Sequence, residues 1–223
     1  MSGADAPDLG PDVRVDGPAP IRPGAPWTLV LAHGAGQGMD SPFMESMAAL
    51  IAAAGIEVVR FEFPYMRAMR HQGGRRPPDP ANRLIAAWHQ ILDRLAGSGL
   101  GPDRLLIGGK SLGGRMASLV ATERPVAGLV CLGYPFHPPG KPEQTRVEHL
   151  RGLQVQTLIC QGTRDPFGRP KEVAGYGLGS AIHLVWIEDG EHSFKPSRTS
   201  RRTWEQNLGE AADAVARWSA TLS

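Results

Sequence analysis

The chain has 223 residues, of which 41% are hydrophobic and 21% are charged, a balance typical of a soluble globular protein with a sizeable core. Its formal net charge of +2 does not indicate a nucleic-acid-binding protein, and no apolar run is long enough to span a bilayer. Asp5 and Asp8 lie where a secretory signal would carry basic and apolar residues. We therefore expect a cytoplasmic protein with neither a nucleic-acid nor a membrane partner.

The predicted elements follow one another without a repeat or a change of composition from residue 27 to residue 223, which indicates a single domain. Residues 1–26 are rich in Pro, Gly, Asp and Ala and predict a loose N-terminal arm, in which the alternation at 13–15 fits a weak edge strand. Continuous apolar runs predict buried strands at 27–32, 56–61, 105–107, 126–132, 156–161 and 183–187. Apolar spacing and capping residues predict helices at 42–55, 79–95, 116–120, 143–150 and 204–222. A basic segment from Arg67 to Arg76 is expected to be a long loop.

This alternation of strands and helices predicts an α/β fold, a doubly wound and mostly parallel sheet with helices on both faces. Ligands bind such sheets at the carboxyl ends of the strands, so the loops that follow the strands should carry the chemistry. Cys131 and Cys160 fall in predicted strands, which suits reduced core thiols, and no zinc-binding spacing is present. We expect no metal site.

The segment Gly109-Lys110-Ser111-Leu112-Gly113 fits the pattern G-x-S-x-G and lies between a predicted strand and a predicted helix. On such a turn the pattern places a serine hydroxyl at the tip of a sharp bend, and Gly109 and Gly113 relieve the collision between strand and helix. Ser111 is therefore a candidate nucleophile. The alternative is a glycine-rich turn that holds a buried serine.

Serine needs a base, and the base needs an orienting acid. His192 follows the last predicted strand and is the candidate base, although a histidine in a surface turn would have the same pattern. The candidate acids are Asp165, Asp189 and Glu188, and Asp189 could instead cap the turn that leads to His192.

Four local matches are similar to the α/β-hydrolase family: His33-Gly34-Ala35-Gly36, the serine turn, Gly162-x-x-Asp165 and Gly190-x-His192. They resemble most the small branch without a cap domain, which includes dienelactone hydrolases and short esterases. The resemblance covers about residues 27–222 and implies that Asp165 is the acid, because this family usually carries the acid after the penultimate strand. It also implies the chain order Ser, Asp, His that is present here.

An oxyanion hole needs two N–H donors aimed at the developing charge. We expect these donors to be the amides of Leu112, just after the nucleophile, and of Ala35, in the glycine-rich loop that contains Gly34 and Gly36. A phosphate-binding loop is the rival interpretation of these glycines. The P-loop pattern is absent, because Gly109-Lys110-Ser111 lacks the earlier glycine that it requires.

Three further features leave alternatives open. The basic segment could favour acidic substrates or could be a solvated loop, His33 could brace the oxyanion loop, and the role of Lys110 is open. The segment between residues 132 and 156 is too short for a lid, so we expect an open site with Tyr134 and Phe136 in its wall.

The sequence thus predicts a serine hydrolase of small carboxylic esters or lactones that needs no metal or organic cofactor. We expect a monomer or a weak homodimer. The alternative is a non-catalytic protein of the same fold that acts as a binding or scaffold module.

Overall fold

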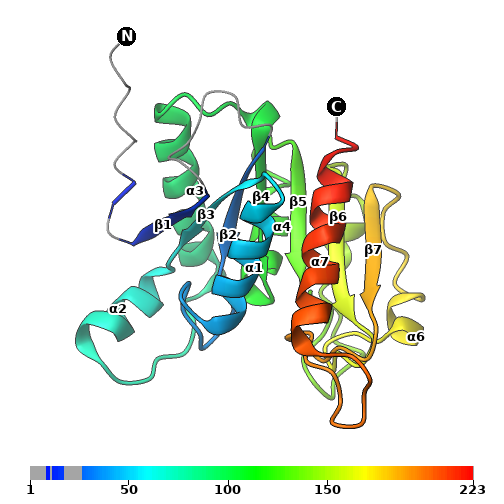
Figure 1. Cartoon of the computed structure of the whole chain (residues 1–223). Helices are drawn as coiled ribbons and strands as arrows, with labels where there is room; N and C mark the ends of the chain where they lie inside the picture. The colour runs from blue at the N-terminus through cyan, green and yellow to red at the C-terminus, as the bar shows by residue number, and fades with distance from the viewer. Residues whose placement is uncertain (1–8, 11, 18–26, 223) are drawn as a thin grey trace.

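The computed structural model describes residues 9–10, 12–17 and 27–222. The elements in chain order are β1 (Val13–Asp16), β2 (Thr28–Ala32), α1 (Pro42–Ala53), β3 (Glu57–Phe61), α2 (Pro64–Gln72), α3 (Ala81–Gly97), the 3₁₀-helix η1 (Pro102–Arg104), β4 (Leu105–Lys110), α4 (Leu112–Val120), β5 (Gly128–Leu132), α5 (Glu148–Arg151), β6 (Thr157–Gly162), α6 (Pro170–Val173), β7 (Ile182–Ile187) and α7 (Trp204–Ser219). Figure 1 shows their arrangement. Within these described ranges, no helix has both the length and the apolar character that crossing a bilayer would require.

The strands form one sheet in the order β1-β3-β2-β4-β5-β6-β7. All neighbouring pairs are parallel except β1 with β3, so the sheet is mixed and mostly parallel. The edge strand expected at residues 13–15 is present as β1, paired with β3 from Val13 opposite Phe61 to Asp16 opposite Val58. The rest of the predicted N-terminal arm, residues 1–8, 11 and 18–26, lies outside the described residues.

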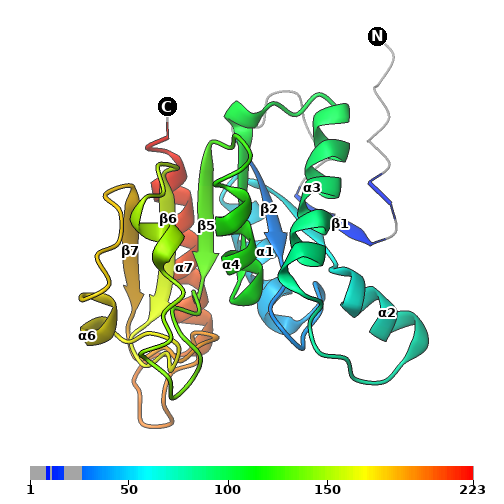
Figure 2. The ribbon, with the colours of Figure 1, turned by 180° about the vertical axis from the view of Figure 1, so that it is seen from behind.

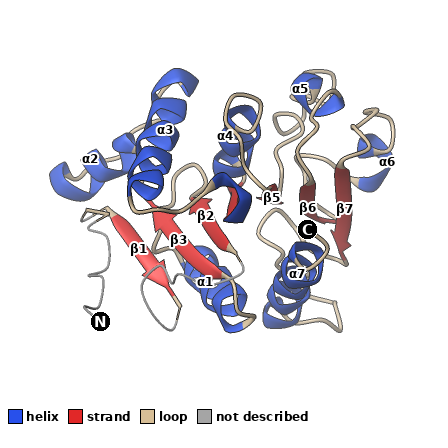
Figure 3. Cartoon of the chain, turned by 90° about the horizontal axis from the view of Figure 1, so that it is seen from above, coloured by secondary structure: helices blue, strands red, loops and turns tan. Residues whose placement is uncertain are grey.

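Helices cover both faces of the sheet, as predicted. Seen from above, α1 and α7 lie on one face, and α2 to α6 lie on the other (Figure 3). The view from behind shows α3 and α4 in front of the central strands (Figure 2). The central strands β2 to β6 are buried along their whole length, which explains their continuous apolar runs. Cys131 and Cys160 are free and buried in two of these strands.

The predicted basic loop between residues 67 and 76 is wrong in its first half, which forms helix α2. Pro64 at the first helical position starts the helix, and the buried side chains of Tyr65 and Met66 attach it to the core. The arginine side chains pair with nearby acids, Arg67 with Asp12 and Arg70 with both Glu62 and Asp40. These ion pairs account for Arg67 and Arg70, two of the basic residues of this segment.

The loop between β5 and β6 also differs from expectation. Only Glu148–Arg151 is helical in place of the predicted 143–150, because the chain before it forms turns and the amide of Arg146 donates to the carbonyl of Phe136. Tyr134 and Phe136 are fully buried and pack against each other in the core, so they do not form a wall of an open site. No lid domain interrupts the sheet between these strands.

Candidate active site

Ser111 lies at the sharp turn between β4 and α4, as the pattern predicts. Its backbone has φ 50° and ψ −113°, a left-handed conformation that is strained in a non-glycine residue. A Cβ on either Gly109 or Gly113 would come within 2.3 Å of the carbonyl oxygen of Ala32. Both glycines are therefore required by the close approach of strand and helix, and this approach holds Ser111 at the turn.

The structure brings Ser111, His192 and Asp165 together at the carboxyl end of the sheet. The Nε2 atom of His192 lies 2.8 Å from the Oγ of Ser111, and its Nδ1 atom lies 2.8 Å from the Oδ2 of Asp165. These residues follow β4, β7 and β6, whose parallel packing places their loops at one edge. The geometry allows a proton to pass from the serine to the imidazole while the carboxylate fixes the ring.

Two residues that the sequence analysis missed support this arrangement. The side-chain amide of Gln161, the next-to-last residue of β6, donates to Asp165 Oδ2 at 2.9 Å and to the carbonyl of Tyr134 at 3.2 Å. The amide of Phe167 donates to Asp165 Oδ1 at 2.9 Å, and the Phe167 ring packs on His192 with centroids 4.2 Å apart. No local pattern marks either residue, because the contacts to Tyr134 and His192 reach loops that follow other strands.

Asp189, the rival acid, does not contact His192. Its carboxylate accepts hydrogen bonds from the backbone amide and the hydroxyl of Ser197 at 2.9 and 2.7 Å, and it also pairs with Arg164. The hydrogen bonds from Ser197 lower the pKa of Asp189 to about 2. Asp189 therefore organises the turn that carries His192, which is the capping alternative considered from the sequence.

The electrostatic environment keeps the His192 ring neutral. Burial disfavours the imidazolium form and lowers the pKa of His192 below its ordinary 6.5, against the opposing hydrogen bond to Asp165. The positive charge of Lys110 lowers that pKa further. A neutral imidazole at neutral pH has a free lone pair on the nitrogen that faces Ser111, which is the form a general base needs.

His33 braces the glycine-rich loop after β2, one of the roles left open above. Its Nδ1 atom donates to the carbonyl of Gly34 at 2.8 Å, and its Nε2 atom accepts from the amide of Phe63 at 3.1 Å. Tyr65 donates a second hydrogen bond to the same carbonyl at 3.3 Å. Burial lowers the pKa of His33, which suits a neutral ring with one donor and one acceptor nitrogen.

A pocket of about 400 Å³ opens above Ser111. Its lining comprises Gly34, Ala35, Gly36, Gln37, Ser41, Met44, Lys110, Ser111, Phe167, His192 and Ser193. The predicted loop residues Gly34, Ala35 and Gly36 thus face the same space as Ser111. Leu112 is the first residue of α4, where backbone N–H groups have no partner within the helix. Phe167 and Met44, rather than Tyr134 and Phe136, supply the apolar wall.

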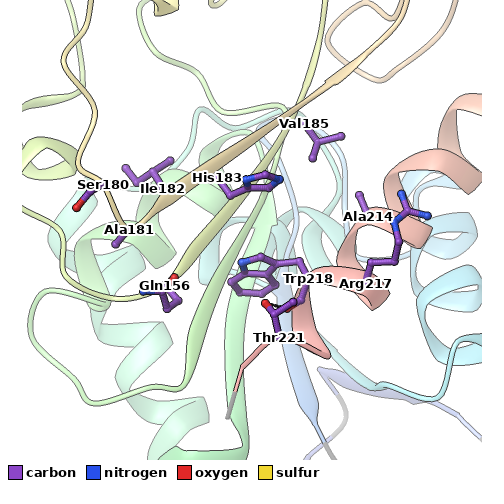
Figure 4. Close-up of a pocket in the computed structure, with 10 residues that line it drawn as sticks. All are labelled: Gln156, Ser180, Ala181, Ile182, His183, Val185, Ala214, Arg217, Trp218 and Thr221. Carbon is purple, nitrogen blue, oxygen red and sulfur yellow. Dashed lines mark hydrogen bonds between the residues drawn. The ribbon is translucent and has the colours of Figure 1, made fainter.

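A larger hollow of about 520 Å³ lies elsewhere, between the amino ends of β6 and β7 and the last turns of α7 (Figure 4). His183 and Trp218 face each other across it, and Arg217 stands at its side (Figure 4). It contains none of the predicted site residues, and it lies at the end of the sheet opposite to the one where such folds bind ligands. We therefore place the candidate active site at Ser111. Among the described residues, no cluster of His, Cys, Asp and Glu side chains could hold a metal ion.

A family model described as an alpha/beta hydrolase domain matches residues 25–220. Among solved structures, the chain is similar to a lidless α/β serine hydrolase from Xanthomonas campestris, with 22% identity over 94% of this chain and 92% of that one and a TM-score of 0.67. It is similar to a dienelactone hydrolase from Anabaena variabilis, with 22% identity, coverage of 92% and 89%, and a TM-score of 0.65.

Another similar structure is Est1E from Butyrivibrio proteoclasticus with ferulic acid bound, at 13% identity, coverage of 94% and 95%, and a TM-score of 0.68. At these low identities the three structures show a shared fold, and the family model carries the family assignment. The lidless serine hydrolase and the dienelactone hydrolase agree with the predicted resemblance to small hydrolases without a cap domain.

Proposed function

This chain belongs to the family of alpha/beta hydrolase domains, and we propose that it is a serine hydrolase that cleaves carboxylic esters or lactones. The observation that carries the proposal is the unbroken series of hydrogen bonds from Ser111 through His192 to Asp165 at the base of a pocket. The fold shared with a dienelactone hydrolase and with Est1E supports this substrate class. We further propose that residues 27–223 form one domain, since a single sheet carries all three residues.

In the proposed reaction, the Oγ of Ser111 attacks the carbonyl carbon while the Nε2 of His192 takes the hydroxyl proton. The ester C–O bond then breaks, and the leaving alkoxide oxygen takes that proton from His192. Water next attacks the acyl-enzyme with His192 again as the base, which releases the acid and restores Ser111. Asp165 keeps the Nδ1 proton of the ring in place during both steps.

The amides of Ala35 and Leu112 are the proposed donors to the oxyanion. Ala35 lies in the loop that His33 and Tyr65 hold by its Gly34 carbonyl, so its position depends on buried contacts. Leu112 begins α4, whose N-terminal dipole also favours negative charge. Such preorganised donors stabilise the tetrahedral intermediate more than the ground state.

Labelling with a fluorophosphonate tests the proposal directly, because the reagent phosphonylates a serine that an adjacent base activates. We expect one modified peptide, with the adduct mapped by mass spectrometry to Ser111. Labelling should be lost after denaturation, which is the control for adventitious reactivity. Intact wild-type protein that is not labelled at Ser111 would favour the non-catalytic alternative.

The pH dependence follows from the environment of His192. Since burial lowers its pKa, the ring stays neutral to lower pH than a free histidine. We expect kcat/KM for a short ester to be constant near neutral pH and to fall toward acid with a midpoint below 6.5. A pH profile of kcat/KM measures this midpoint, and a midpoint above 6.5 would contradict the assigned base.

Lengthening the acyl chain beyond a few carbons should not raise the rate of hydrolysis, because the pocket holds about 400 Å³ and no lid extends it. Each methylene buried in a deep tunnel would contribute about 0.8 kcal/mol, or about fourfold in kcat/KM. We expect p-nitrophenyl esters to peak at short chains and decline for long ones, with no activation by lipid micelles. A rate that still rises through long-chain esters would show an acyl tunnel that this pocket does not contain.

A further inference from the structure

Lys110 is the residue directly before the proposed nucleophile, and the proposed mechanism does not use it. It is the last residue of β4, only 7% exposed, and it lines the pocket above Ser111. Burying an ammonium group costs several kcal/mol unless partners compensate for it. Among the described residues its ammonium makes no salt bridge, and the carboxylates of Asp165 and Glu191 act on it through their charge alone.

The side chain of Lys110 reaches the glycine-rich loop after β2, helix α1 and the turn that carries His192. The aliphatic part of its side chain packs against the glycine-rich loop. A Cβ added to Gly34 in that loop would lie only 3.3 Å from Lys110 Cγ. Its ammonium lies 5.3 Å from the centre of the Phe43 ring in α1 and donates to the backbone carbonyl of His192 at 2.5 Å. Lys110 therefore links the serine turn to the turn that carries the base.

The ammonium also lies beside the imidazole. A Cβ on Gly133, after β5, would lie 3.0 Å from Lys110 Nζ and 3.4 Å from His192 Nδ1, so both nitrogen atoms border the same small space. Gly133 keeps that space open and has φ 67°, a conformation that favours glycine. The charged groups that act on both side chains are the carboxylates of Asp165 and Glu191, which oppose the effect of burial.

We propose that Lys110 is a positioning residue for the hydrolysis: its ammonium holds the His192 turn by the main-chain carbonyl and places a positive charge beside the imidazole. The charge disfavours the imidazolium form in the free enzyme, so the base stays neutral and available at lower pH. Burial lowers the pKa of Lys110 to about 8, which leaves the ammonium charged throughout the pH range in which His192 titrates. This inference rests on the proposed function, because it assigns Lys110 a role in that reaction.

The test compares Lys110→Met, which removes charge and hydrogen bond, with Lys110→Gln, which removes the charge but keeps an N–H donor. For Lys110→Met we expect kcat to fall about tenfold or more, because the turn that carries His192 loses the contact that positions the base. The acid limb of the pH profile, where kcat/KM falls toward low pH, should move to higher pH in both variants. Both variants remove the positive charge that lowers the pKa of His192. Lys110→Gln should lose less kcat than Lys110→Met, because its amide can still donate to the carbonyl of His192.

Lys141→Met is the matched control, because Lys141 is exposed in the loop between β5 and β6. It should leave kcat and the acid limb unchanged. If circular dichroism shows that Lys110→Met is unfolded, the pH profile of kcat/KM for Lys110→Gln tests the proposal by itself. A histidine ring titration by NMR, which needs no activity, should show the same upward movement for His192.

The outcomes separate the two proposals. Absence of fluorophosphonate labelling at Ser111 in the wild type would overturn the proposed function. Wild-type hydrolysis together with folded Lys110 variants whose kcat and acid limb match the wild type would overturn the role of Lys110 alone. A change confined to the thermal midpoint, with the pH profile unmoved, would likewise mean that Lys110 serves only packing.

Discussion

The Ser111→Ala variant is expected to lose ester hydrolysis almost completely while it keeps the wild-type fold. In the proposed mechanism the Oγ atom forms the covalent bond, and removing the nucleophile of a serine protease alone costs about 10⁶-fold in kcat. The only side chain to which the Ser111 hydroxyl bonds in the described residues is His192, so its loss leaves the packing of the turn intact. Measuring kcat/KM on p-nitrophenyl acetate and the thermal midpoint of both proteins checks this result.

Ser180→Ala is a suitable control, because Ser180 is exposed and lines the hollow at the other end of the sheet. It should retain wild-type activity. If Ser111→Ala kept most of its activity at an unchanged thermal midpoint, the nucleophile would be another residue. Loss of activity in Ser180→Ala would instead direct attention to the second hollow.

The Asp165→Asn variant should show the second largest loss. Asp165 accepts from His192 Nδ1 through Oδ2 and from the Phe167 amide through Oδ1, so an amide at this position presents a donor where an acceptor is required. The ring would then adopt the tautomer with its proton on Nε2, which cannot accept a proton from Ser111. In a serine protease the same change lowers kcat by about 10⁴-fold, and we expect a loss of that order here.

Asp189→Asn provides the comparison, because it is the other acid beside the His192 turn. Its carboxylate bonds to Ser197 rather than to the ring, so we expect kcat to change by less than about tenfold. Steady-state kinetics of both variants with the same ester rank the two acids. The opposite ranking would mean that Asp189 orients the base, against the contacts in the structure.

Much of the fold followed from local patterns. Strands β2 to β6 are covered on both faces, so they must be apolar along their whole length, and this makes them visible as runs of buried residue types. Helices α1 and α7 were equally clear, because Pro42 marks the start of α1 and the apolar spacing from Trp204 marks α7. Helix α2 was not predicted, because its many basic residues are typical of a solvated loop and only two of its side chains are buried in the core.

The residues that meet in the candidate site were predicted because parallel strands deliver their loops to the same edge of the sheet. Ser111 directly follows β4, Asp165 and His192 lie in the turns after β6 and β7, and glycines mark these turns. The choice between Asp165 and Asp189 was not available from the residues, since both acids lie in turns near His192. It depended on a family resemblance until the 2.8 Å contact from Asp165 to the ring was seen.

Tertiary packing decides the features that have no sequence pattern. Gln161 and Phe167 support Asp165 and His192 from positions that resemble any strand end or turn. Tyr134 and Phe136 are buried, and both bond to the backbone of Arg146 in the loop after β5. Lys110 is an exposed residue type that becomes buried because the glycine-rich loop, helix α1 and the turn that carries His192 converge on its side chain. Local patterns record which face of an element is covered. The contacts of Gln161 with Tyr134, and of Phe167 and Lys110 with His192, join residues far apart in the chain, so they depend on how the loops pack at the edge of the sheet.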